Sequence, residues 1–431
     1  MTSENFPVRR TAIAAVAAGA CAAAIAGTSL GAAPTANASC VSLFGIGNGN
    51  GCTSNIFSIA LAIGNGATAT ANGFLGAAIV LGSGATAETA DAFTFATAVG
   101  DASVATAEGL FGIATQLGSN GTASTFGSGS FGNFGLNIAL NLAPGSAGDS
   151  VTAAGIGNLA ANLFGRASAP GTHTVSSLGT LDVALNVAGQ DNTVKSGAGL
   201  FNRSFNFFGR NNTVTGEGGL SNAARNFFGD GNTVTTAGGD ANSASNFLGS
   251  GNAVTVVAGA GNIATSLLGD GNEVAVTGGT LDGARNWFGR QNKVTTTGGL
   301  LNSVTNIGGD SNVLDSLGAN SNNARNLFGS GNVLTAGSVG SNSTGATSFG
   351  GSGNQVTGTG TNTRGFAVFG TDNTVEAGPG PFALAGSVLQ NGKTVTKVGP
   401  GIAINNIRIG GAAAEAPRKP AASRAVRGNA R

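Results

Sequence analysis

The chain of 431 residues consists largely of small and apolar residues, with 76 Gly and only 9% Asp, Glu, Lys and Arg, where about 25% charged residues is typical. It has one His, one Trp and no Tyr, so the residue types that most catalysis requires are scarce. The net charge is +1, and most of the positive excess lies near the C-terminus. We therefore expect no catalytic residues, no cofactor and no nucleic-acid partner.

Residues 1–38 have the pattern of an export signal. Arg9 and Arg10 precede an Ala-rich apolar stretch, and Ala36 and Ala38 are the small residues expected before a cleavage site. The pattern predicts a secreted or envelope-associated, extracytoplasmic protein. Retention of the stretch as a membrane anchor remains open, as does twin-arginine rather than general export.

Two cysteines remain after removal of this signal, Cys40 and Cys52. Thiols of exported proteins usually pair, so we expect a disulfide that ties down the first structural repeat. A zinc site would need more ligands than these two cysteines and the distant His173, so no metal is expected. Lipid attachment at Cys40 is disfavoured because Asn37 stands where an aliphatic residue is usual.

An internal repeat of 20 residues indicates the fold. Asn recurs in two columns half a period apart, and Gly closes each half. One column contains Asn212, Asn232, Asn252, Asn272, Asn292, Asn312 and Asn332, and the other contains Asn202, Asn222, Asn242, Asn262, Asn302, Asn322 and Asn342, with Asp282 as a substitute. Short alternating segments separated by Gly predict an all-β, parallel β-solenoid, with Asn side chains forming ladders between coils.

The periodicity divides the chain into segments. Gly64, Gly82, Gly100 and Gly118 are 18 residues apart, which predicts slimmer Ala-lined coils. We assign 1–38 to the signal, 39–125 to 18-residue coils, and 126–180 to degenerate coils and loops. Residues 181–380 are assigned to 20-residue coils, 381–410 to a C-terminal cap with a hairpin at Asn391-Gly392, and 411–431 to a disordered basic tail.

Alternation along the strands predicts which side chains face the interior. We expect Val214, Val234 and their equivalents to form one wall, and Asn222, Ala224, Asn226 and Phe228 the other. An adjacent column of opposite parity is the candidate binding stripe: Phe207, Phe227, Phe247, Leu267, Trp287, Ile307 and Leu327. Either this column faces solvent, or the strand kinks and turns both aromatic columns into a closed corner, which is the interpretation we favour.

Other polar patterns give no reactive site. Arg210, Asp230, Ser250, Asp270, Arg290, Asp310 and Ser330 share a column whose cations argue against calcium and favour a surface ladder. We expect His173 in an exposed loop. Outward Thr pairs such as Thr213 with Thr215 are expected to be good strand formers rather than an ice-binding lattice.

Repeats such as Asn326-Leu-Phe-Gly-Ser-Gly-Asn332 resemble the Gly- and Asn-rich repeat regions of mycobacterial surface proteins of the PE-PGRS and PPE-MPTR type. The resemblance covers the repeats only and implies an actinobacterial envelope protein with a surface-facing role. We expect a non-enzymatic structural or adhesive protein whose partners are an envelope component, a glycan, a host surface molecule or further copies of itself. The alternatives are a carbohydrate-active solenoid enzyme and a self-assembling or ice-binding-like fibre.

Overall fold

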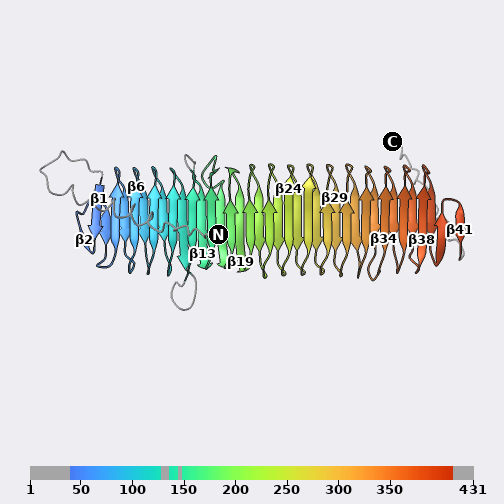
Figure 1. Cartoon of the computed structure of the whole chain (residues 1–431), viewed down its shortest axis with the longest axis horizontal. Helices are drawn as coiled ribbons and strands as arrows, with labels where there is room; N and C mark the ends of the chain where they lie inside the picture. The colour runs from blue at the N-terminus through green and yellow to red at the C-terminus, as the bar shows by residue number, and fades with distance from the viewer. Residues whose placement is uncertain (1–38, 128–134, 144–147, 411–431) are drawn as a thin grey trace, which may run out of the picture.

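The computed structural model describes residues 39–127, 135–143 and 148–410, and it is a long rod of stacked coils (Figure 1). The expected signal and basic tail lie outside these residues. Every regular element in the described ranges is a β-strand. Within the same ranges no helix is long and apolar enough to cross a membrane. The all-β, parallel β-solenoid predicted from the repeat is confirmed.

Two sheets, here called sheet A and sheet B, form the two sides of the rod. Neighbouring strands of sheet A are β2 (Ile46–Gly47), β1 (Ser39–Leu43), β4 (Ile59–Ile63), β6 (Ala77–Leu81), β8 (Phe95–Val99), β10 (Ile113–Leu117), β12 (Ile138–Leu142), β14 (Leu159–Leu163), β17 (Val183–Asn186), β20 (Arg203–Asn206), β22 (Ala223–Asn226), β24 (Ser243–Leu248), β26 (Ile263–Leu268), β28 (Gly283–Asn286), β30 (Ser303–Asn306), β32 (Asn323–Leu327), β34 (Gly345–Phe349), β36 (Arg364–Val368), β38 (Ala383–Val388), β40 (Gly401–Ile404) and β41 (Ile407–Ile409).

Sheet B is formed by the strands that alternate with these along the chain. They are β3 (Cys52–Ser54), β5 (Thr68–Ala71), β7 (Thr86–Thr89), β9 (Val104–Ala107), β11 (Thr122–Gly127), β13 (Ser150–Ile156), β16 (Thr174–Thr180), β19 (Thr193–Leu200), β21 (Thr213–Glu217), β23 (Thr233–Ala237), β25 (Ala253–Val257), β27 (Glu273–Thr277), β29 (Lys293–Thr297), β31 (Val313–Leu317), β33 (Val333–Ala336), β35 (Gln355–Gly358), β37 (Thr374–Ala377) and β39 (Thr394–Lys397). A small third pair joins β15 (Gly165–Arg166) to β18 (Gly189–Gln190).

The strand register gives the length of each coil. Ile59 pairs with Ala77, and Ala77 with Phe95, in the slim coils. Val214 pairs with Val234, one 20-residue repeat later. Between these regions Ile113 pairs with Ile138, so sheet A remains unbroken where the two strands are 25 residues apart in sequence.

The interior is lined by small residues from sheet A and by Ala, then Val and Leu, from sheet B. Ala78 and Ala87 are fully buried in the slim coils, as are Val214 and Ala224 in the later ones. The expected position of Phe228 in this core is wrong, because its side chain is 46% exposed. Strand β22 ends at Asn226, so the alternation of faces does not extend two residues further.

Asn side chains hold successive coils together in the two expected columns. The backbone N–H of Asn232 donates to Oδ1 of Asn212 over 2.9 Å, while Nδ2 of Asn212 donates to the carbonyl of Gly229 over 2.8 Å. The backbone N–H of Asn242 likewise donates to Oδ1 of Asn222 over 3.0 Å. The predicted ladders are confirmed, and their Asn side chains bond to backbone groups that the turns leave unpaired. Asn342 is the exception among the expected members, because the backbone N–H of Thr344 takes its place and donates to Oδ1 of Asn322 over 3.0 Å.

A third Asn ladder runs through the middle of sheet A and has no counterpart among the expected columns. Nδ2 of Asn226 donates to Oδ1 of Asn206 over 2.8 Å, and Asn246 repeats the bond with Asn226 over 2.8 Å. The ladder begins where Asn141 donates to Oε1 of Gln116 over 2.6 Å. From Asn141 to Asn246 these fully buried amides are paired with one another, which satisfies polar groups that water cannot reach.

Each end of the rod departs from the parallel pattern. Strand β1 pairs antiparallel with β4, and the predicted disulfide between Cys40 and Cys52 joins β1 to β3 across the interior. At the other end β41 pairs antiparallel with β40. The hairpin therefore turns at Asn405, later than the expected site, since Asn391 and Gly392 form a corner between β38 and β39.

Candidate binding surface

The candidate stripe lies along one long edge of the rod and is accessible from outside. Trp287 is 44% exposed and Phe247 36%, while Phe207, Phe227, Leu267, Ile307 and Leu327 are partly buried by their neighbours. The rings of Phe207 and Phe227 stack with centroids 4.9 Å apart, and those of Phe227 and Phe247 stack at 4.8 Å. The stripe is thus a partly exposed apolar column beside sheet A, and its first three rings are stacked.

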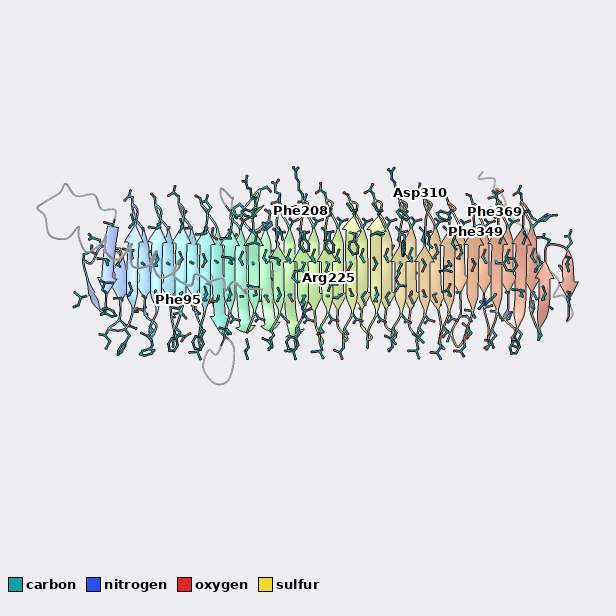
Figure 2. The ribbon with its side chains drawn as sticks, viewed as in Figure 1. Phe95, Phe208, Arg225, Asp310, Phe349 and Phe369 are labelled. Atoms are coloured by element: carbon teal, nitrogen blue, oxygen red, sulfur yellow. A yellow bond between two sulfur atoms is a disulfide. The ribbon has the colours of Figure 1, made fainter. Side chains whose placement is uncertain are left out.

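The adjacent aromatic column is also at the surface. Phe208 is 44% exposed and Phe288 45%, and the rings of Phe208 and Phe228 stack at 5.2 Å. Figure 2 shows Phe208, Phe349 and Phe369 along this edge of the rod. The closed corner that we favoured from the sequence is therefore wrong, because side chains of both columns are exposed to solvent. We call the two columns together the aromatic edge.

Cationic side chains without acidic neighbours lie beside the aromatic edge. Arg225, Arg285, Arg325 and Arg364 are on outward positions of sheet A strands, and Figure 2 shows Arg225 over the face of the rod. No described strand of sheet A contains Asp or Glu. This part of the face therefore combines guanidinium groups with apolar rings and lacks carboxylates.

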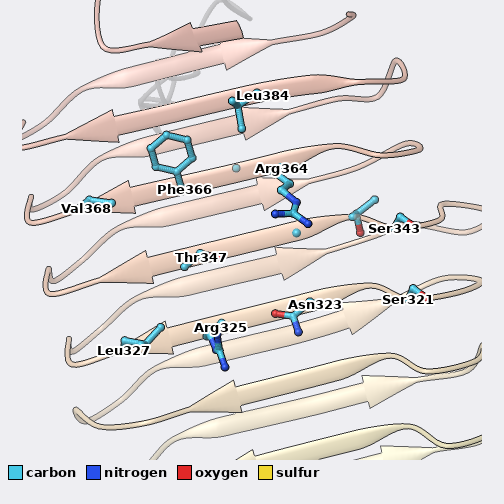
Figure 3. Close-up of a pocket in the computed structure, with 13 residues that line it drawn as sticks. Ser321, Asn323, Arg325, Leu327, Ser343, Thr347, Arg364, Phe366, Val368 and Leu384 are labelled. Atoms are coloured by element: carbon cyan, nitrogen blue, oxygen red, sulfur yellow. The ribbon is translucent and has the colours of Figure 1, made fainter. Parts of the chain in front are cut away.

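A shallow groove of about 750 Å³, here called the arginine groove, crosses this face toward the C-terminal end. Arg325, Arg364, Phe366, Leu384 and hydroxyl-bearing residues line it. Figure 3 shows Arg364 reaching from its own strand toward the strand that carries Thr347. The hollow exists because Gly345 takes an outward position there, and the Arg364 stem lies over it. Neither Arg325 nor Arg364 has an ion-pair partner among the described residues.

A second surface, here called the apolar face, covers the outer side of sheet A from β1 to β17, across the slim coils and the three strands that follow them. Its outward residues are Val41, Leu43, Ile59, Leu61, Ile63, Ala77, Ile79, Leu81, Phe95, Thr97, Val99, Ile113, Thr115, Leu117, Ile138, Leu140, Leu142, Leu159, Leu163, Val183 and Leu185. The sequence interpretation missed this face. Its signal is that large apolar residues alternate with the Ala that fills the narrow interior, as in Ile59-Ala-Leu-Ala-Ile63.

His173 is buried inside the rod, which corrects its expected position in an exposed loop. Its neighbour Thr174 pairs with Thr193, so His173 occupies the column of Asn192. The backbone N–H of Asn192 donates to Nδ1 over 3.1 Å, and Nε2 lies 3.1 Å from Oδ1 of Asn162. Burial lowers the pKa of His173 to about 4 against the opposing charge of Asp191. His173 is thus a neutral ladder member.

Two carboxyl groups also replace ladder amides. Asp182 and Asp282 are buried in the second Asn column, and each accepts a backbone N–H from the next coil over 2.7 Å. Burial raises the pKa of each to about 6, against the lowering effect of these hydrogen bonds. They are separated by five repeats, and the described residues contain no group of three His, Cys, Asp or Glu side chains able to hold a metal.

The charged column at the corner forms the surface ladder expected from the sequence. The backbone N–H of Arg290 donates to Asp310 over 2.7 Å, and its guanidinium lies 3.9 Å from Asp270. Asp230 caps the N–H of Arg210 in the same way over 2.7 Å. Outward Thr residues, including Thr213 and Thr215, lie on sheet B.

Comparison of the chain with family models, curated proteins and solved structures returns no match.

Proposed function

We propose that this protein is a secreted or envelope-associated, non-enzymatic repeat protein that acts as a structural rod and binds acidic glycans. The observation that supports acidic glycans as the ligand is the arginine groove. Guanidinium groups bind carboxylate and sulfate in bidentate geometry, and the ring of Phe366 offers an apolar surface for a sugar face. The disulfide supports an oxidising, extracytoplasmic location, and the repeats support a relationship to mycobacterial Gly/Asn-rich surface proteins.

A glycan array that includes uronic-acid and sulfated polymers tests the ligand class. The unmodified chain should bind acidic glycans, and Arg325→Gln combined with Arg364→Gln should weaken that binding by at least tenfold. The matched control is Arg210→Gln with Arg290→Gln, which removes the same charge from the corner column and should leave binding within twofold. Equal binding by both double variants would refute the groove as the site. Binding of the unmodified chain to neutral glycans only would refute it as well.

Fractionation of the producing cell tests the location. The chain should be found in the envelope or the medium with Cys40 and Cys52 oxidised. Recovery of the chain in the cytoplasm with both thiols free would contradict the proposed location.

A further inference from the structure

The apolar face is large for the exposed surface of a solitary rod. It covers eight neighbouring strands, from β1 to β17, of which most contribute three outward residues. With strands about 4.8 Å apart and about 3.3 Å per residue along each strand, the face measures roughly 40 Å by 16 Å. That is roughly 600 Å² in projection, at the upper end of what a monomer exposes as one patch.

Charge distinguishes this face from the rest of the molecule. Between residues 39 and 165 the sequence contains no Lys, Arg or His. The acids there lie at the corners or on sheet B: Asp91 and Glu108 precede sheet A strands, and Asp101 follows one. A surface adapted to anionic lipid would need basic residues around its rim, and this rim is acidic.

We infer that the apolar face is the contact between two copies of this chain, packed sheet against sheet in a two-fold arrangement. Two such faces together bury roughly 1,200 Å² or more, which reaches the lower limit of stable interfaces. No charged side chain would lose its hydration in this contact, whereas the Arg-bearing half of sheet A would bury unpaired guanidinium groups. Side chains of facing sheets interdigitate at about 10 Å separation, and Ile79 and Ile113, each 37% exposed, are available for this.

Sedimentation of the purified full chain over a range of concentrations tests the contact. The unmodified protein should form dimers, and Ile79→Lys with Ile113→Lys should raise the dissociation constant at least a hundredfold. The matched control is Val104→Lys with Ser124→Lys, outward positions of sheet B in the same region, which should leave dimerisation unchanged. Circular dichroism melts of both variants should match the unmodified chain, because all four positions face outward.

Two further measurements separate this contact from other occupants. Pyrene attached at Thr115→Cys should give excimer emission at dimer concentrations, while pyrene at Thr305→Cys, on the Arg-bearing half of the same sheet, should not. Added salt should strengthen the dimer, because it screens the acidic rims. A monomer at all concentrations, a dimer that salt dissociates, or monomers captured by neutral phosphatidylcholine vesicles through Ile79 and Ile113 would each overturn the inference. Because the arginine groove is not involved, failure here leaves the glycan proposal unaffected.

Discussion

Asp282 places a carboxyl group in the second Asn column, where most repeats have an amide. Its Oδ1 accepts the N–H of Asn302, but Oδ2 has no hydrogen-bond partner, whereas Nδ2 of Asn242 in the same column donates to the carbonyls of Gly238 and Gly259. Only the protonated acid can make the equivalent bond. Burial raises the pKa of Asp282 to about 6, which means that the folded chain favours the neutral carboxyl group.

Asp282→Asn should therefore stabilise the rod at neutral pH. The folded state has a raised pKa, so the stabilising effect of the proton is present in acid and is lost as the pH rises from about 4 through about 6. The variant should gain up to about 3 kcal/mol at pH 7 and little at pH 4. Paired thermal melts at the two pH values measure this, and an equal gain at both would show that ionisation is not the cause.

His173 gives the opposite pH dependence. Its pKa falls from 6.5 to about 4 on folding, so the unfolded chain binds the proton first. Stability should decline as the pH falls from about 6.5 toward 4, by up to about 3 kcal/mol, with no effect of this group above 6.5. His173→Asn restores the ladder residue and should remove this slope in urea titrations. A slope that survives the substitution would exclude His173 as its source.

At the scale of strands and ladders, Ser266 interrupts the central Asn column. Ser266 follows Asn246 and precedes Asn286 in the register of β24, β26 and β28. The hydroxyl of Ser266 and Nδ2 of Asn286 are both buried without a partner. This gap is a defect in an otherwise continuous ladder, and unpaired buried amides are costly.

Ser266→Asn should close the gap and raise stability by about 1 to 2 kcal/mol, since it supplies an acceptor for Asn286. The reverse change, Asn306→Ser, should open an equal gap and lower stability, because Asn326 donates to Asn306 over 2.8 Å. Denaturant midpoints of both variants provide the comparison. Destabilisation by Ser266→Asn would mean that the coil at this point is too narrow for the amide.

What the sequence predicts at this scale is limited by where each strand ends. From Val194 to Leu334 the 20-residue period repeats without insertion, so the faces of the Val and Asn columns there follow from counting. Phe228 was misplaced because its orientation depends on the corner after Asn226, where alternation stops. His173 was misplaced because 24 residues separate Ser150 from its partner Thr174, and this insertion hides the column. The arginine groove depends on which outward residue is Gly, and on contacts between coils.

At the scale of the whole molecule, stability is distributed over neighbouring coils. Each coil pairs only with the one before and the one after it, and the corners stack so closely that a side chain at Gly229 would meet the carbonyl of Gly249 at 1.9 Å. In such a one-dimensional array, a substitution that destabilises one coil also destabilises its neighbours, and the effect decreases with distance along the rod. The terminal coils have a neighbour on one side only, so we expect the disulfide to stabilise the first of them.

Removal of this disulfide should loosen one end of the rod and leave the middle intact. Cys40 and Cys52 are buried on opposite sheets of the first coil, and they close a loop of 12 residues, a constraint worth about 3 kcal/mol. In Cys40→Ala with Cys52→Ala, amides of β1 and β4 should exchange hydrogen much faster, while those of β22 to β30 keep their protection. Thr68→Ala, an exposed change near the same end, should alter neither region. Loss of protection along the entire rod would instead mean that the coils unfold as one unit.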